Sequence, residues 1–238
     1  MAKKEEICIE KISREMTQGK TAPYLCTDDE NNKHIVKGRK AASSGLVKEW
    51  ICARLGTAFG LPIPDFALAW ADAPLQKVKE LYEYNFASRF IENIQDVTTS
   101  TLSKLPKQLL KDLYFFDYWI RNNDRTLRQG QGNPNFFYNP AKDNALVIDH
   151  NLAFDKEFEL SKHKELHVSA PFIEWNEIFE TERAYYTELI ELSLKEMENM
   201  LAELPEEWLE IYSIEQVNQE ILPILSQYKN DNFWEDIK

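Results

Sequence analysis

The sequence has few cysteines and no long apolar run, and both absences limit the class of protein. Its cysteines, Cys8, Cys26 and Cys52, are odd in number and lack the spacing of a metal site. This pattern argues against a disulfide framework or a zinc knuckle, and we expect buried thiols in a reducing cytosol. No stretch approaches about 18 uninterrupted apolar residues, and the first residues mix Lys and Glu without an apolar signal region. We therefore predict a soluble cytoplasmic protein with no membrane partner.

Basic residues are also scarce, with 28 Lys and Arg against 40 Asp and Glu, which gives a net charge of −12. Such a balance disfavours direct nucleic-acid binding, because that requires clustered basic side chains. Hydrophobic residues at 43% and charged residues at 29% are ordinary globular values. No low-complexity tract or repeat divides the chain, so we predict two lobes, residues 1–91 and 92–238, that share one cleft as a single catalytic unit.

Glycine is rare, and the first loop with a phosphate-binding character has a single one. Gly19, Lys20 and Thr21 lie between an expected strand at 7–12 and another at 24–27. Backbone N–H groups of such a loop could close over phosphates. A plain hairpin turn explains the same residues equally well, because one glycine is no fingerprint.

A lysine and a glutamate form the next candidate pair. Alternation in a strand at 34–38 places Ile35 and Lys37 on one face. A helix capped by Ser43 or Ser44 is expected to end near Phe59, with Glu49 at the margin of its apolar stripe. Glu49 could then hold the Lys37 ammonium for phosphate contact. The simpler alternative is a surface glutamate. Further strands are expected at 65–71 and 86–91, with a helix at 75–84.

The remaining candidate catalytic and metal-binding residues lie in the stretch 110–154. A buried helix that Pro106 opens is expected to end at Asn122-Asn123, so that Asp124 lies on a loop anchored by the helix. Strands at 135–138 and 145–149 form a hairpin, in which alternation places Asn135 with Phe137 and Val147 with Asp149. Asp124 could deprotonate a hydroxyl while Asn135 and Asp149 hold Mg²⁺. Alternatively, each Asn or Asp is a turn residue.

Two histidines have a spacing typical of metal ligands on a helix. His163 and His167 are four residues apart, but no third ligand is close in the sequence. We therefore do not expect a metal site there. From Pro171 onward the chain is expected to be helical.

Seven short stretches, in this order, carry a family resemblance. They are His-Ile-Val-Lys at 34–37, Leu-Val-Lys-Glu-Trp at 46–50, Leu-Gly-Thr-Ala-Phe-Gly-Leu-Pro-Ile-Pro at 55–64, Phe-Ala-Ser-Arg-Phe-Ile at 86–91, Asn-Asn-Asp-Arg-Thr at 122–126, Asn-Pro-Asn-Phe-Phe at 133–137 and Leu-Val-Ile-Asp-His at 146–150. Together they resemble the HipA-like kinases, compact bacterial relatives of the protein kinase and phosphatidylinositol kinase fold. The resemblance covers about the first two-thirds of the chain.

The resemblance implies an α+β, two-lobed protein-kinase-like fold, with a small antiparallel sheet in the N-lobe and a mainly helical C-lobe. It also implies an ATP- and Mg²⁺-dependent kinase that acts on Ser or Thr of a protein. Lys37 resembles the lysine that touches the α- and β-phosphates, and Glu49 its helix partner. Asp124 resembles the catalytic aspartate with Arg125 beside it, and Asp149 the metal-binding aspartate.

Further expectations depend on this resemblance. Adenine is expected between the lobes, against Ile35 and Phe137 with Val147 nearby, and a hinge is expected at 88–91, which includes Ser88, Phe90 and Ile91. Self-phosphorylation at Thr17 or Thr21 could eject the phosphate loop and silence the enzyme.

Two departures from the family pattern concern the metal and the partner. The segment 127–132 resembles an insertion, which leaves Asn133 and Asn135 as rival metal ligands. Asn135 is preferred because it begins the expected strand. Full toxins of the family carry an additional N-terminal subdomain that we do not identify here, so a separate antitoxin-like or regulatory protein could supply that surface. A small-molecule or lipid kinase, an ATP-binding pseudokinase and a non-catalytic interaction module remain alternatives.

Overall fold

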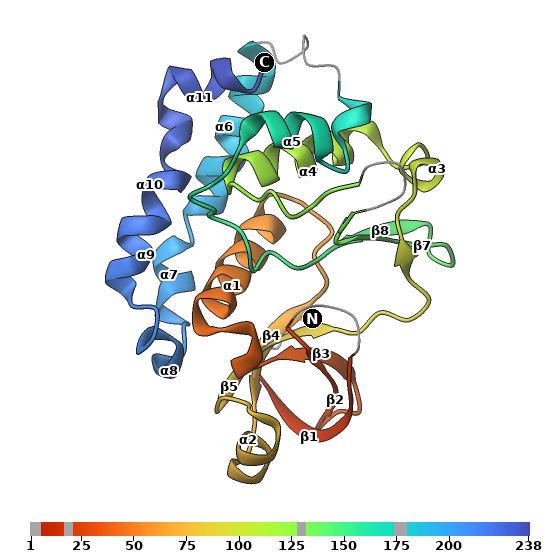
Figure 1. The fold of residues 1–238 in the computed structure, drawn as a ribbon, viewed down its shortest axis with the longest axis vertical. Helices are drawn as coiled ribbons and strands as arrows, with labels where there is room; N and C mark the ends of the chain where they lie inside the picture. Colours follow the sequence, from red (N-terminus) through yellow and green to blue (C-terminus); the bar gives the residue numbers. More distant parts are fainter. Residues whose placement is uncertain (1–5, 17–20, 128–131, 174–179) are drawn as a thin grey trace.

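A computed structural model describes residues 6–16, 21–127, 132–173 and 180–238. Five strands close into a barrel at one end of the molecule, in the order β1-β2-β3-β5-β4 (Figure 1). Their bounds are β1 (Glu6–Glu15), β2 (Tyr24–Asp28), β3 (Lys33–Lys37), β4 (Phe66–Trp70) and β5 (Tyr84–Arg89). The pairing of β1 with β4 is parallel and closes the barrel, whereas the other pairs are antiparallel. The predicted small antiparallel sheet is thus corrected to a closed barrel with one parallel pair.

The barrel interior is filled by alternate side chains of its strands. Ile7 and Ile9 of β1 and Val36 of β3 are buried there, next to the small side chains of Ala67 and Ala69 in β4. Small residues suit a narrow barrel because interior positions must fill it without voids. Since Val36 points inward, its neighbours in β3 point outward.

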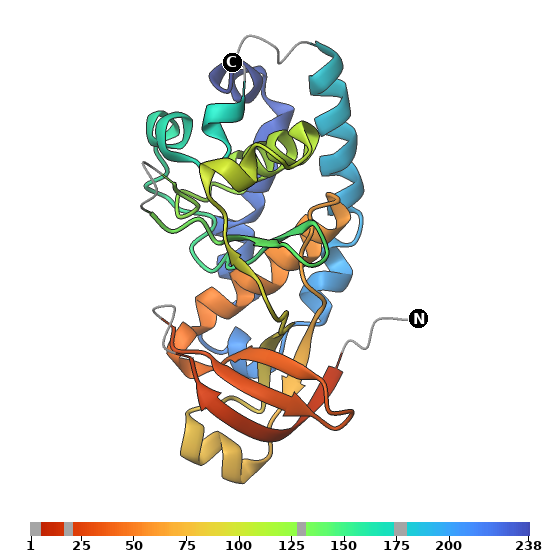
Figure 2. The same cartoon turned by 90° about the vertical axis from the view of Figure 1, so that its right-hand side faces the viewer.

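Helix α1 (Ser43–Ala58) crosses between the barrel and the rest of the molecule (Figure 2). Its N-cap is Ala42, which makes no side-chain cap bond, so the predicted serine cap is wrong. Trp50 and Leu55 of α1 belong to the large hydrophobic core that also contains Trp119 and Trp208. The predicted division at residue 91 remains a prediction. Helix α1 packs against three helices from the C-terminal part of the chain, α6 (Glu180–Leu194), α7 (Met197–Ala202) and α8 (Glu206–Leu209).

The short helix α2 (Ala73–Lys79) lies at the outer end of the barrel (Figure 1). Asp72 caps it by accepting from the Leu75 amide at 2.9 Å. The helix ends at Glu80, which has a left-handed φ of 52°. The predicted continuation to residue 84 is therefore wrong, and Leu81 is instead fully buried in the barrel core.

A second sheet and a buried helix lie beyond α1, on the side away from the barrel (Figure 1). The sheet has the order β6-β7-β8, and its strands are β6 (Gln95–Asp96), β7 (Phe136–Asn139) and β8 (Asn144–Val147). Helix α4 (Lys107–Trp119) follows the short α3 (Thr99–Leu102) and begins after Pro106, as predicted. Its residues Leu113 and Phe116 are completely buried, which anchors the loop that follows.

The remaining helices surround this core on one side (Figure 1). They are α5 (Leu160–Leu166), α6 (Glu180–Leu194), α7 (Met197–Ala202), α8 (Glu206–Leu209), α9 (Ile214–Glu220), α10 (Leu222–Leu225) and α11 (Asp231–Asp236), with short 3-10 turns at Arg39–Ala41, Ala170–Phe172 and Gln227–Lys229. Cys26 and Cys52 are buried, as predicted, whereas Cys8 is only half-buried. In the described ranges, no helix has the length and apolar character needed to span a membrane.

Candidate active site

Lys37 lies between two carboxylates from distant parts of the chain. Its Nζ is 3.0 Å from Oε2 of Glu49 in α1 and 2.8 Å from Oδ1 of Asp149, which follows β8. Lys37 is only 8% exposed and Glu49 only 4%. Glu49 is therefore not a surface residue, and the interpretation that pairs it with Lys37 is the one that the geometry supports.

The charges at this point stabilise one another. Burial alone would lower the pKa of Lys37, but the carboxylates of Glu49 and Asp149 raise it, so the ammonium stays protonated. Burial raises the pKa of Asp149, but the charge of Lys37 outweighs it and the net direction is downward. The same Oε2 of Glu49 also accepts the backbone N–H of His150 at 3.2 Å. This bond joins α1 to the segment that carries Asp149.

Asp124 is held by two asparagine amides. Its Oδ2 accepts Nδ2 of Asn133 at 2.6 Å and Nδ2 of Asn135 at 3.0 Å. Burial and the nearby charge of Asp149 raise the pKa of Asp124, although the two amides act in the opposite direction. The structure thus brings both rival asparagines to the same carboxylate oxygen. Asn135 is 8% exposed, whereas Asn133 is an exposed residue.

Backbone conformation sets the directions of two of these side chains. Asn135 has a φ of 41° and Asp149 a φ of 60°, and both lie just outside the hairpin strands. Asn and Asp tolerate this left-handed region better than other non-glycine residues. The prediction that strand alternation orients Asn135 and Asp149 is therefore wrong, because a positive φ interrupts the period of two. Their side chains contact Asp124 and Lys37 instead.

Gly132 closes the loop between Asp124 and Asn135. The Thr126 amide donates to the carbonyl oxygen of Asn133 at 3.0 Å, and Gly132 has a φ of 135°. A Cβ at Gly132 would lie 2.5 Å from the Thr126 carbonyl oxygen. Because no side chain fits there, we expect Gly132→Ala to open the loop and displace both asparagines. Phosphate transfer should fall while global stability changes by about 1–3 kcal/mol. Gly60→Ala is the control, since nothing lies near its added Cβ.

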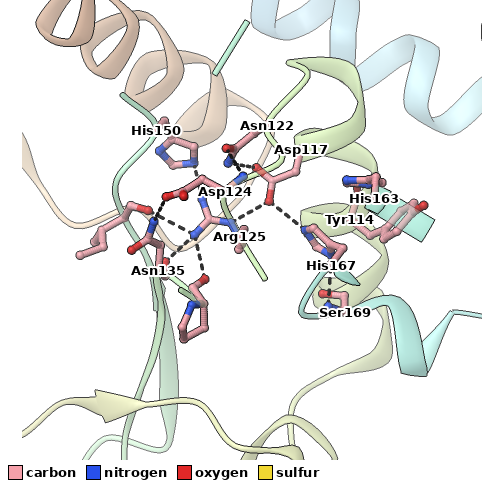
Figure 3. Close-up of polar contacts among 12 residues, drawn as sticks. Tyr114, Asp117, Asn122, Asp124, Arg125, Asn135, His150, His163, His167 and Ser169 are labelled. Carbon is pink, nitrogen blue, oxygen red and sulfur yellow. Dashed lines mark hydrogen bonds and ion pairs between the residues drawn. The ribbon is translucent and has the colours of Figure 1, made fainter. Parts of the chain in front are cut away.

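Arg125 is fully buried and organises the loop instead of facing a substrate (Figure 3). Its Nε donates to Oδ2 of Asp117 at 2.7 Å, and its Nη2 lies 3.0 Å from Nε2 of His150. Its Nη1 donates to the carbonyl oxygens of Pro134, Asn135 and Ile148. The prediction that Arg125 belongs to the catalytic pair is therefore corrected: its guanidinium positions the loops that carry Asp124, Asn135 and Asp149.

The partners of Arg125 were not predicted from the sequence. Asp117 of α4 is completely buried and accepts Nδ2 of Asn122 at 2.9 Å and Nε2 of His167 at 2.9 Å. Burial raises the pKa of Asp117, but the Arg125 charge and the His167 bond lower it well below its usual range. One signal was present in the sequence, since Asp117 is a lone charge within Tyr-Phe-Phe-Asp-Tyr-Trp. A charge so placed must be paired when it is buried.

Burial lowers the pKa values of the three histidines near this network and so favours their neutral forms. Burial, and then the charge of Arg125, lowers the pKa of His150 to about 3. Burial is also the largest cause that lowers the pKa values of His163 and His167. The unfolded chain therefore binds more protons than the native state as the pH falls through about 6.5.

We expect stability to decrease between pH 7.5 and pH 6, with a slope that approaches about 1.4 kcal/mol per pH unit for each such histidine. Urea unfolding at several pH values measures it. His150→Gln should reduce the slope, because glutamine does not titrate. A free energy of unfolding that is independent of pH in this window would contradict the assignment of neutral histidines.

Each histidine of the pair has a structural partner. Nε2 of His167 bonds to Asp117, and Nε2 of His163 lies 3.1 Å from the Tyr114 carbonyl oxygen. Within the part of the chain that the structure describes, no three His, Cys, Asp or Glu side chains form a group that could hold a metal ion. Nε2 of each histidine thus has a structural partner, and the expectation that this pair binds no metal stays a prediction.

The residues expected around adenine are only partly brought together. Ile35 lies on the outer face of β3, as Lys37 does, and both it and Phe137 are half-buried. Val147 is completely buried and pairs with Phe136, on the opposite face of the hairpin from Phe137. The side chain of Val147 belongs to the core, and the expectation that it lies near adenine stays a prediction.

Part of the expected hinge, residues 88–91, is already hydrogen-bonded to neighbouring strands and loops. Ser88 lies within β5 and pairs with both β3 and β4. The amides of Arg89 and Phe90 donate to the carbonyl oxygens of Asp65 and Lys33. The amide donors of Arg89 and Phe90 are therefore already used within the barrel and its flanks. Gly19 and Lys20 lie outside the described residues, and Thr21 is a half-buried turn residue.

The site thus contains a lysine that is held by a glutamate from a helix and by an aspartate that follows a hairpin. Protein kinases use this arrangement beside the phosphates of the nucleotide. The model of the family described as HipA-like kinase matches residues 9–237. The chain therefore belongs to the HipA-like kinase family, which confirms the resemblance seen in the sequence.

One solved structure has a similar fold. The chain is similar to the crystal structure of the Helicobacter pylori proinflammatory kinase CtkA, with a TM-score of 0.51 and 10% sequence identity. The match covers 93% of this chain and 95% of that chain. At this identity the likeness shows the fold alone, a mixed α+β kinase fold. A search of curated proteins found no match.

Proposed function

We propose that the protein is an ATP- and Mg²⁺-dependent kinase that transfers phosphate to Ser or Thr of a protein. One observation carries this proposal: Lys37 contacts Glu49 and Asp149 at once, beside a hairpin whose Asn135 also holds Asp124. Phosphoryl transfer needs these groups, since its catalysis is mainly positioning and electrostatic stabilisation.

Lys37 is the group that contacts the phosphates of ATP in this proposal. Its charged ammonium is fixed by Glu49, so it does not lose orientational freedom when phosphate binds. The barrel and the helical part act as two lobes, with adenine between Ile35 and Phe137. Both side chains are half-buried, which leaves apolar surface for a ring to cover.

Asp149 and Asn135 fit a magnesium ion. A carboxylate and an amide oxygen are hard ligands of the kind that Mg²⁺ prefers. Asn135 gives its amide nitrogen to Asp124, which directs the amide group into the site. Asn133 makes the same bond but is exposed, and we therefore prefer Asn135. When bound, Mg²⁺ neutralises charge on the phosphates.

Asp124 orients the acceptor hydroxyl and takes its proton. Its raised pKa supports this role, because a more basic carboxylate is a better proton acceptor. The Asn133 and Asn135 amides fix Oδ2, which leaves the other carboxylate oxygen for the hydroxyl. Thr17 and Thr21 stay candidates for self-phosphorylation, and peptide mapping after incubation with ATP would locate the phosphate.

Nucleotide binding is tested by thermal unfolding. We expect ATP with Mg²⁺ to raise the melting temperature of the wild type, because a ligand that binds only the native state adds about 2.7 kcal/mol at 100 times its Kd. Lys37→Met should lose this shift relative to its own melting temperature without ATP. Lys33→Met is the matched control, since Lys33 begins the same strand but has an exposed ion pair with Glu92. Equal shifts in both variants would contradict the role of Lys37.

A further inference from the structure

Asn122 is a buried amide side chain between helix α4 and the proposed catalytic acid. It is only 1% exposed. Its Nδ2 donates to Oδ1 of Asp117 at 2.9 Å, and its Oδ1 accepts the backbone N–H of Asp124 at 3.2 Å. Figure 3 shows Asn122 with Asp117 on one side and Asp124 on the other. One amide group thus connects a residue of the helix to the residue that takes the proton in the proposed reaction.

The two partners fix the orientation of this amide group. The backbone N–H of Asp124 can only donate, so the atom of Asn122 that faces it must be the oxygen. The Asp117 carboxylate is ionised, because its pKa lies well below the usual range, and it can only accept. The nitrogen of Asn122 must therefore face Asp117. An aspartate at this position would lack the donor, and an aliphatic side chain would lack both groups.

The residue to which Asn122 is attached is itself rigidly held. Asp117 lies within α4 and is completely buried. Arg121 has a left-handed φ of 51° just after the helix, and the backbone N–H of Asn122 then donates to the Asp117 carbonyl oxygen at 2.8 Å. Backbone and side chain of Asn122 are thus both bonded to the same helical residue. Asn122 therefore holds the Asp124 backbone in a defined place relative to α4.

Asp124 is consequently held from two directions. Asn133 and Asn135 donate to its carboxylate oxygen Oδ2, whereas Asn122 accepts its backbone N–H. The first two bonds set the rotation of the carboxylate, and the third sets the position of the backbone from which the side chain extends. Both matter for the rate, because displacing a reacting group by about 1 Å can cost about 10²-fold.

We propose that Asn122 is a positioning residue of the kinase reaction, which places the Asp124 carboxylate against the acceptor hydroxyl by holding the Asp124 backbone N–H. This inference rests on the proposed kinase function and extends it to a residue outside the proposed nucleotide and metal contacts. The role differs from that of Arg125, whose guanidinium donates to the carbonyl oxygens of other loop residues.

The test exchanges the two side chains that form the bond. Asn122→Asp would bring two carboxylates together and Asp117→Asn two amide nitrogens, since their facing atoms are 2.9 Å apart. Each change should lower the apparent kcat about 100-fold. In the double variant Asn122→Asp/Asp117→Asn, the amide at position 117 can donate to the carboxylate at position 122, which still accepts the Asp124 N–H. It should recover about tenfold relative to the slower single variant, because contacting residues couple.

Transfer is measured with labelled ATP, Mg²⁺ and a degenerate mixture of peptides with one central Ser or Thr, below the melting temperature of every variant. The KM for ATP and the melting shift with ATP and Mg²⁺ should stay as in the wild type, since Lys37 and Asp149 are unchanged. Asn122→Ala removes both side-chain bonds without adding a charge. It should show the same fall in kcat at an unchanged KM for ATP.

The outcomes separate a positioning role from a structural one. A residue that only stabilises the fold would lower the melting temperature and leave the kcat of the folded enzyme unchanged. Wild-type kcat in Asn122→Ala, or no recovery in the double variant, would overturn the role of Asn122 and leave the kinase proposal intact. If the double variant does not fold, Asn122→Ala decides alone. Absence of labelled peptide with the wild type would overturn the proposed protein kinase activity, and this inference with it.

Discussion

Replacing Asp124 by asparagine is expected to lower phosphate transfer by at least about 100-fold, because a positioned general base contributes about 10²–10⁴-fold to such a reaction. Asparagine keeps the shape and can still accept a hydrogen bond, but it cannot take the proton of the acceptor hydroxyl. The melting shift with ATP and Mg²⁺ should persist, since Lys37 and Asp149 are unchanged. Labelled product formation and thermal unfolding measure the two effects separately.

The control for this change is Asp96→Asn. Asp96 is an exposed residue of β6, so the same chemical change there should leave the transfer rate unaltered. If Asp124→Asn transferred phosphate as fast as the wild type, Asp124 would have no part in the reaction. If it also lost the melting shift, the asparagine contacts of Asp124 would instead be needed for nucleotide binding.

Arg125→Met should produce the largest loss of stability, a decrease of about 3–5 kcal/mol in the free energy of unfolding. Arg125 and Asp117 are both completely shielded from solvent, with side-chain exposures of 0% and 0%. Methionine fills similar volume but leaves the Asp117 carboxylate with His167 and Asn122 alone. Transfer should fall as well, because three carbonyl groups around the site lose their donor.

An exposed pair provides the matched comparison. Arg183 lies 2.7 Å from Asp231, the same N–O distance as in the buried pair, but with side-chain exposures of 43% and 82%. Arg183→Met should cost only about 0.2–1 kcal/mol, as is usual for solvated ion pairs. Urea unfolding measures both variants. Similar losses for Arg125→Met and Arg183→Met would contradict the structural role of Arg125.

The sequence predicted those strands and helices that are determined by local hydrophobic periodicity and composition. The strands around Val36, the helix that contains Glu49 and the helix after Pro106 follow from alternation, amphipathic spacing and a starting proline. The proximity of Lys37 and Glu49 could be proposed because one face of a short strand was already defined. The family resemblance, now confirmed by the match over residues 9–237, supplied the order of the remaining groups.

The predictions that were wrong concern features that depend on contacts between residues far apart in the sequence. No local pattern shows that Glu6 pairs with Leu68, which is the step that closes the barrel. The left-handed φ of Asn135 cannot be inferred from alternation, which assumes an extended chain. Burial of Arg125 depends on Asp117, eight residues earlier, and on His150, which arrives from the hairpin. The three-dimensional structure is therefore needed to tell which of two adjacent residues is catalytic and which one supports it.

The most direct test of the account is transfer of labelled phosphate from ATP to protein. Wild type, Asp124→Asn and Asp96→Asn would each be incubated with labelled ATP and Mg²⁺, alone and with a bacterial lysate. We expect a labelled protein, the chain itself or one from the lysate, with the wild type and Asp96→Asn but not with Asp124→Asn. No labelled protein with the wild type, or equal labelling with Asp124→Asn, would contradict it.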